Sequence, residues 1–181
     1  MSVAVRRPRI REVPPIRALS IFIKHFKERK YVIYLAGTLT QAEADKLIQM
    51  LKKTVEEQIL FPIEKGGVSF HVIGERRGDE FIINIDRKGK MAEKCTYQGR
   101  VQQSNQVLMR LDIDPNGRHT NPEPDGRLII GNHLHIYCEE HDMKFAIPFD
   151  PEDKGLYELC YTFFEKFHII EPPEVFYQET I

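Results

Sequence analysis

The residues best suited to chemistry in this chain are concentrated between Arg118 and Tyr137. This stretch reads R-H-T-N-P-E-P-D-G-R-L-I-I-G-N-H-L-H-I-Y and holds three of the seven histidines. Its second half alternates between polar and apolar residues, which is typical of a β-strand whose two faces have different surroundings. His133, His135 and Tyr137 are expected on one face and apolar residues on the other. We therefore predict a polar site on one side of this strand.

Metal-independent cleavage of RNA is the chemistry that these residue types suit best. RNA carries its own nucleophile, the 2′-OH, so an enzyme supplies only a base, an acid and cations. Histidine suits the first two roles because its pKa lies near neutrality, and arginine grips phosphate oxygens. We expect His133 or His135 as the general base and His119 as the general acid. The other predicted site residues are three phosphate-binding arginines and two tyrosines that position the nucleotide, namely Arg100, Arg110, Arg118, Tyr97 and Tyr137.

Two other functions use the same residues. His133 and His135 are two residues apart and can face one metal ion, which His119 can reach from the preceding loop. Few carboxylates accompany these histidines in the sequence, so the leading hypothesis has no cofactor. A protein that binds without catalysis is the other alternative, because tyrosines and arginines stack on bases and are common in protein interfaces. The expected partners are RNA or another nucleic acid, a cognate antitoxin, or a host protein.

The pattern around this stretch predicts a helix, a run of strands and a second helix. Thr40 and Glu43 form a capping-box pattern that opens a helix predicted to extend to Ile59. Pro151 is expected at the first position of the second helix. Alternation between these helices predicts six strands, at 68–72, 81–85, 94–101, 107–113, 128–137 and 143–147. The connection at 114–126 is longer than a hairpin needs, which favours a functional loop.

This order predicts an α+β fold: a meandering antiparallel sheet of five to six strands, flanked by an N-terminal and a C-terminal helix. We assign residues 1–36 to a basic arm with an amphipathic segment, 37–171 to a single domain and 172–181 to a short tail. Residues 1–30 hold nine Lys or Arg and only two Glu. A basic arm of this kind can help to hold a polyanion such as RNA.

The composition excludes several classes of protein. The net charge is −1, hydrophobic residues make up 41%, and no apolar run reaches transmembrane length, so we expect no membrane partner. Three cysteines without a paired spacing predict reduced thiols and a cytoplasmic protein. The phosphate-binding glycine motifs are absent, as are the G-x-S-x-G and H-E-x-x-H motifs, which argues against nucleotide-driven, α/β-hydrolase and zincin chemistry.

The chain from about residue 39 to 148 resembles a family of small bacterial and phage proteins catalogued only as a domain of unknown function. The shared motifs read L-T-Q-A-E-A-D at 39–45, N-I-D-R at 84–87, Y-Q-G-R at 97–100, G-R-H-T-N-P at 117–122, G-N-H-L-H-I-Y at 131–137 and A-I-P at 146–148. The resemblance implies a shared site at the histidines but no activity. Small proteins of phages and mobile elements are often toxins, antitoxins or inhibitors of host defence. By that analogy we expect a toxin-type endoribonuclease or RNA-binding protein, with a non-catalytic inhibitor of a host defence protein as the alternative.

Overall fold

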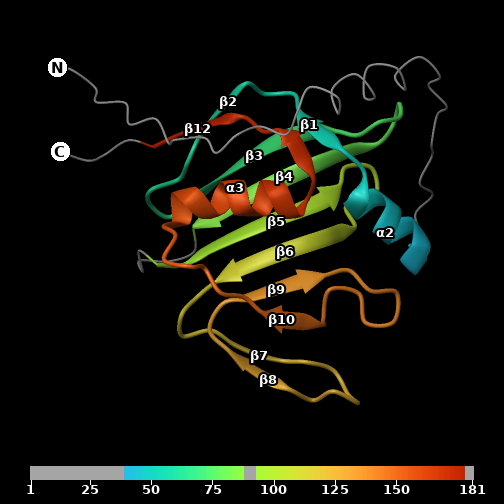
Figure 1. Cartoon of the computed structure of the whole chain (residues 1–181), viewed down its shortest axis with the longest axis vertical. Helices are drawn as coiled ribbons and strands as arrows, with labels where there is room; N and C mark the ends of the chain where they lie inside the picture. Colours follow the sequence, from blue (N-terminus) through green and yellow to red (C-terminus); the bar gives the residue numbers. More distant parts are fainter. Residues whose placement is uncertain (1–38, 88–92, 178–181) are drawn as a thin grey trace.

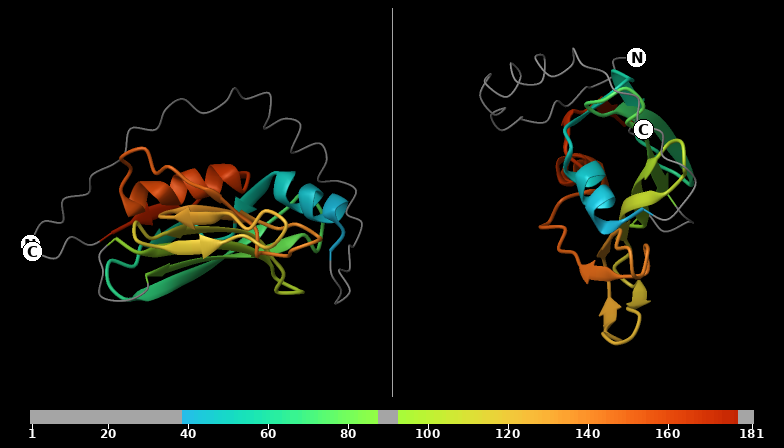
Figure 2. Two further views of the ribbon diagram at one scale, coloured as in Figure 1. Left: turned by 90° about the horizontal axis from the view of Figure 1, so that it is seen from below. Right: turned by 90° about the vertical axis from the view of Figure 1, so that its right-hand side faces the viewer.

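A single broad sheet with both helices on one face organises the molecule (Figures 1 and 2). The structure, a computed structural model, describes residues 39–87 and 93–177. Within these residues eight strands form a mixed sheet in the order β10-β9-β6-β5-β4-β3-β1-β11. Its strands are β1 (Lys52–Thr54), β3 (Gly66–Ile73), β4 (Glu80–Arg87), β5 (Cys95–Val101), β6 (Val107–Ile113), β9 (His133–Ile136), β10 (Ala146–Pro148) and β11 (Ile169–Glu171). The α+β prediction is confirmed, but the sheet is larger than the five to six strands expected.

Shorter elements complete the fold. Helices α2 (Gln41–Gln49) and α3 (Leu156–Lys166) cover one face of the sheet. Strands β2 (Gln58–Leu60) and β12 (Glu174–Phe176) pair in parallel, and β7 (Arg118–Thr120) and β8 (Leu128–Ile130) form an antiparallel hairpin.

The predicted tail at 172–181 therefore contains a paired strand, β12. The predicted basic arm lies outside the described residues. Neither helix of the described part is long and apolar enough to span a membrane.

The first helix ends ten residues earlier than we predicted. Its capping box is present, with the Thr40 hydroxyl and the Glu43 carboxylate each bonded to the other's backbone amide. The helix stops at Gln49, because the ammonium group of Lys52 donates to the carbonyls of Ile48 and Met50. These bonds satisfy carbonyls that a longer helix would use. The freed residues form β1, which pairs in parallel with β11 and widens the sheet.

The second helix begins five residues after Pro151, which we expected at its first position. Glu152 and Asp153 have φ angles of +54° and +59°, which no right-handed helix contains. Gly155 is the residue before the first turn, and its backbone amide donates to the Glu158 carboxylate at 2.9 Å. Asp150 binds the backbone amide of Glu152 instead of opening the helix. The start of α3 is thus set by Glu158 rather than by the proline.

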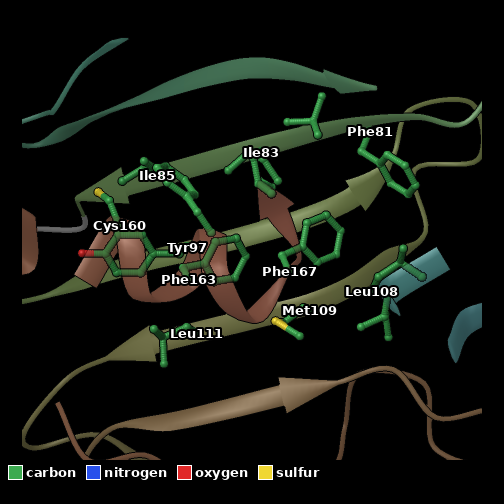
Figure 3. Close-up of a cluster of buried hydrophobic side chains, with 14 of the residues drawn as sticks. Phe81, Ile83, Ile85, Tyr97, Leu108, Met109, Leu111, Cys160, Phe163 and Phe167 are labelled. Carbon is green, nitrogen blue, oxygen red and sulfur yellow. The ribbon is translucent and has the colours of Figure 1, made fainter. Parts of the chain in front are cut away.

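The core lies between the sheet and α3, and it is rich in aromatic rings (Figure 3). Phe163 on α3 stacks at 6.0 Å on Phe167, the residue that follows the helix, and Phe167 meets Phe81 of β4 edge-on at 5.8 Å. Strands β3 to β6 pair antiparallel in sequence order, as the alternation predicted. Because side chains alternate along each strand, the residues between these core positions lie on the face that carries no helix.

Substitution of Gly99 by alanine is expected to lower the free energy of unfolding by about 1–3 kcal/mol, since extra methyl groups strain a packed core. A Cβ at Gly99 would lie 2.8 to 3.1 Å from three ring atoms of the fully buried Phe167. Gly66→Ala is the matched control, because a Cβ there has no neighbour within 4 Å. Urea unfolding of the two variants checks this. Equal stabilities would contradict the packing of α3 on β5.

Candidate functional site

The three histidines of the predicted site converge in space. The ring centroids of His119 and His133 are 5.3 Å apart, those of His119 and His135 4.8 Å, and those of His133 and His135 5.0 Å. One ring nitrogen from each lies within 4.8 Å of the others. His133 and His135 come from β9 and His119 from β7, whose hairpin lies beside the β9–β10 edge of the sheet (Figure 1). We refer to these three residues as the histidine cluster.

The cluster sits on the face of the sheet that carries no helix. In the pairing of β6 with β9, Asp112 lies opposite His133 and Arg110 opposite His135. Leu111, between them, faces the core. Arg110 and Asp112 therefore project on the same side as the histidines. His133 and His135 are nonetheless 7% and 0% exposed, so the site is a buried polar cluster.

Backbone carbonyls fix one nitrogen on each of two rings. His133 Nδ1 is 2.9 Å from the carbonyl of Gly131, and His119 Nε2 is 2.9 Å from the carbonyl of Lys144. A carbonyl only accepts, so both of these nitrogens carry the proton and donate. The lone pairs of the neutral rings are then on Nε2 of His133 and Nδ1 of His119.

Asn121 holds the loop that presents His119. This asparagine is buried, and its side-chain oxygen accepts from His119 Nε2 at 3.1 Å and from the backbone amide of Ala146 at 2.9 Å. Its side-chain nitrogen donates to the carbonyl of Ala146 and to the Asp125 carboxylate. The amide thus pairs with both backbone groups of Ala146 and joins the loop to β10. Asn121 was not among the predicted site residues, although the H-T-N-P motif contains it.

Asp112 connects the cluster to Arg110. Its Oδ2 accepts from Arg110 Nε at 2.8 Å and lies 3.6 and 3.5 Å from Nε2 of His133 and His135, while Oδ1 accepts from the Thr96 hydroxyl. Burial raises the pKa of Asp112, but the charge of Arg110 and the hydrogen bond from the Thr96 hydroxyl outweigh it and hold that pKa well below its usual value. Asp112 is therefore an anion beneath the histidines, and it was also missed by the sequence prediction.

His135 differs from the other two histidines. Its Nε2 is 2.9 Å from Arg110 Nη2, which can only donate. Nε2 therefore accepts, and the proton of the neutral ring is on Nδ1. Nδ1 is buried and, among the described side chains, is the one buried polar atom without a hydrogen-bond partner. Such an atom costs free energy, and it belongs to a residue of the histidine cluster.

Both predicted tyrosines were placed wrongly. Tyr97 is fully buried on the helix-covered face, where its ring stacks on Phe163 and its hydroxyl donates to the carbonyl of Leu156. It alternates with Thr96, so it cannot share the face of the histidines. Tyr137 follows the end of β9 at Ile136, so the alternation no longer applies, and its hydroxyl donates to the carbonyl of Leu39. Neither ring is available to a nucleotide.

Of the three predicted arginines, the structure brings only Arg110 to the cluster. Arg100 is on β5, two strands from β9, and donates to side-chain oxygens of Asn84 and Asn105. Arg118 is exposed and adjacent to His119 on β7, so the two side chains project from opposite faces of the strand.

An open pocket of about 500 Å³ adjoins the cluster. His119 and His135 form part of its wall, together with Arg110, Lys144 and Asp142. The Asp142 carboxylate accepts from the Gln106 side chain at 2.7 Å. A ligand in this pocket would therefore touch two of the three imidazoles and two cationic side chains.

The chain belongs to a family of unknown function, DUF6978, whose sequence pattern matches residues 39–169. The match confirms the resemblance predicted from the motifs, and it includes the whole histidine cluster. No curated protein and no solved structure matches the chain.

Proposed function

We propose that the histidine cluster binds one divalent transition-metal ion, zinc or a similar metal, and that the ion activates water for hydrolysis in the adjoining pocket. The observation that carries this proposal is the buried Nδ1 of His135. A cation bound there replaces the proton of Nδ1 and provides the partner that this atom lacks. The Nε2 of the same ring then carries the proton and can donate to Asp112, 3.5 Å away.

The surroundings of the other two rings favour the same ion. His133 Nε2 holds a lone pair and lies 3.6 Å from the Asp112 carboxylate. The nitrogen and the carboxylate oxygen are both acceptors and repel each other. A cation bound to His133 Nε2 would remove this repulsion. Gly131 and Lys144 accept from the remaining nitrogens of His133 and His119. Ligating histidines usually donate their second N–H to a carbonyl or carboxylate, which fixes the ring and strengthens the ligand.

The donor set and its spacing indicate the class of metal. Imidazoles suit zinc, copper, iron and nickel rather than magnesium or calcium. Zinc–nitrogen bonds of about 2.0–2.1 Å in a tetrahedron put the nitrogens roughly 3.3 Å apart, so rings whose nitrogens lie within 4.8 Å need to close by about 1.5 Å. Three protein ligands leave the fourth position for water, as in catalytic rather than structural zinc sites. Water bound to zinc loses a proton near neutral pH and becomes a nucleophile.

Cobalt(II) is the probe that tests the proposal. The full chain, freed of metal by a chelator and then dialysed, is titrated with Co²⁺ and followed by visible absorption. The proposal predicts d–d bands of low-symmetry, four- or five-coordinate cobalt that saturate at one ion per chain and disappear on addition of Zn²⁺. A spectrum that stays that of hydrated cobalt contradicts it.

Asn121→Ala is expected to weaken zinc binding by about 10–100-fold, the usual effect of losing a group that orients a ligand. The variant removes the side-chain oxygen that accepts from His119 and the amide pairing with Ala146. Asn116→Ala is the matched control, since Asn116 lies exposed in the same connection and its contact to Asp114 is through its backbone. Isothermal titration with Zn²⁺ checks both variants, and equal affinities would show that Asn121 does not position a ligand.

Metal-independent cleavage of RNA is the second candidate, and the position of Arg110 favours it. The Arg110 guanidinium is 2.9 Å from His135, and both line the pocket with His119. A base, an acid and a phosphate-binding cation are then together, with His133 or His135 as the base and His119 as the acid. This candidate predicts that the protein cleaves single-stranded RNA in excess chelator. The metal hydrolase loses its activity under that condition and regains it with Zn²⁺.

A further inference from the structure

We infer that a metal ion at the histidine cluster releases Arg110 from His135, and that the released guanidinium, with Lys144, binds a phosphoryl group of the ligand in the adjoining pocket. The inference rests on the proposed metal site and adds to it a class of ligand and a coupling between two binding events. It follows from which nitrogen of His135 carries the proton.

The contact between Arg110 and His135 cannot persist in both states of the ring. In the metal-free chain, Arg110 Nη2 donates to His135 Nε2 at 2.9 Å. A metal ion on Nδ1 takes the lone pair of that nitrogen, so the neutral ring carries its proton on Nε2. The ring changes tautomer, with no net gain or loss of a proton. Two N–H groups then face each other, and Asp112 Oδ2, 3.5 Å from His135 Nε2, can accept the hydrogen bond instead.

Arg110 remains beside the pocket after this change, because a second bond holds it. Its Nε donates to Asp112 Oδ2 at 2.8 Å, and Thr96 fixes the other oxygen of that carboxylate. The guanidinium can therefore turn about a fixed point while its Nη groups move away from His135. Its side chain is 33% exposed, and it forms part of the pocket wall.

The pocket's charges select the ligand. Arg110 and Lys144 line it, and the proposed ion adds further positive charge beside them. The one acidic lining residue, Asp142, accepts a hydrogen bond from Gln106. Two cations next to a metal ion match the double charge of a phosphoryl group, and a guanidinium fork binds two of its oxygens. A carboxylate offers a single charge and only two oxygens, so we expect it to bind less tightly.

Binding of the metal and of the phosphoryl group must then be reciprocal, because any coupling free energy acts equally in both directions. We expect phenylphosphonate, a probe that resists hydrolysis, to bind the zinc-loaded full chain at least about tenfold more tightly than the metal-free chain. Zinc should bind more tightly by the same factor when phenylphosphonate is present. Benzoate, the carboxylate of matching shape, should bind the zinc-loaded chain at least about tenfold less tightly than phenylphosphonate. Isothermal titration calorimetry measures these affinities.

Variants show whether the anion is bound by Arg110 and Lys144 or only by direct contact with the metal. Arg110→Met should lower the coupling factor to the part that the charge of the ion supplies by itself, and Lys144→Met should weaken phenylphosphonate binding to the zinc-loaded chain. The backbone carbonyl of residue 144, which holds His119, remains in this variant. Lys46→Met, on α2, is the matched control. Long-range ¹H–¹⁵N spectra of the wild type supply an independent test, because the His135 proton should move from Nδ1 to Nε2 when zinc binds.

The outcomes are distinguishable. A chain that binds no zinc overturns the proposed function itself. Zinc binding with equal phenylphosphonate affinities in both states, a coupling factor that Arg110→Met leaves unchanged, or a His135 proton that stays on Nδ1 overturns this inference alone. Benzoate binding as tightly as phenylphosphonate overturns the assignment of a phosphoryl group and leaves a carboxylate ligand.

Discussion

Replacement of His135 by alanine is expected to weaken zinc binding by at least about 1,000-fold, because one of three metal–nitrogen bonds is lost from a site worth on the order of 10 kcal/mol. His119→Ala and His133→Ala should have effects of similar size. The three residues come from two separate strands, β7 and β9, so a common loss of affinity requires that they meet at one ion. Competition titration against a chromophoric zinc chelator measures affinities over this range.

His71→Ala is the matched control for these variants. His71 is on β3, on the same helix-free face of the sheet, and its ring pairs with Glu56 at 2.9 Å. Its removal should leave zinc affinity unchanged. The account of the cluster is wrong if any one of the three cluster variants binds zinc as tightly as His71→Ala, provided that circular dichroism shows all the variants to be folded.

Replacement of Lys52 by methionine is expected to lower the free energy of unfolding by about 3 kcal/mol, because it leaves buried acceptors without donors. Lys52 is fully buried, and its ammonium group donates to the carbonyls of Ile48, Met50 and Phe167 at 2.8 to 2.9 Å. These carbonyls end α2 and α3, so one side chain joins the ends of both helices. Lys46→Met, near the end of α2, is the control, and urea unfolding is the measurement.

The same side chain gives stability a dependence on pH. Burial is the main cause that lowers the pKa of Lys52 to about 7, against the charges of Asp79 and Glu75, while in the unfolded chain that pKa is about 10.4. Between these values the unfolded chain binds more protons than the folded chain, so the free energy of unfolding rises with pH. The difference in stability between wild type and Lys52→Met should therefore widen from pH 7 to pH 9. A constant difference would show that the ammonium stays protonated over this range.

The sequence allowed the residues of the cluster to be predicted but not their partners. Alternation put His133 and His135 on one face, and the long connection suggested that His119 could join them. Asp112 is twenty-one residues before His133, and only the register between β6 and β9 brings the two together. A register between strands depends on tertiary packing, which periodicity within one strand does not report. For the same reason Arg100 and Arg110, equally plausible in the sequence, have different positions relative to the cluster.

The errors in the predicted elements also have physical causes. A helical apolar pattern continued through Lys52, but a buried ammonium that binds carbonyls ended the helix at Gln49. Tyr97 was assigned to the site for its chemistry, although its neighbours in β5 alternate so that it faces the core. In both cases the residue types suggested one structure, and tertiary packing produced another.

The zinc stoichiometry of the full chain decides whether the histidine cluster is a metal site. Purified wild-type protein and a His119→Ala/His133→Ala/His135→Ala variant are dialysed against the same micromolar zinc solution, and bound metal is determined by elemental analysis. A metal site at the histidine cluster predicts one zinc ion per wild-type chain and none retained by the triple variant. Wild-type protein that holds no more zinc, cobalt or nickel than the triple variant would contradict it.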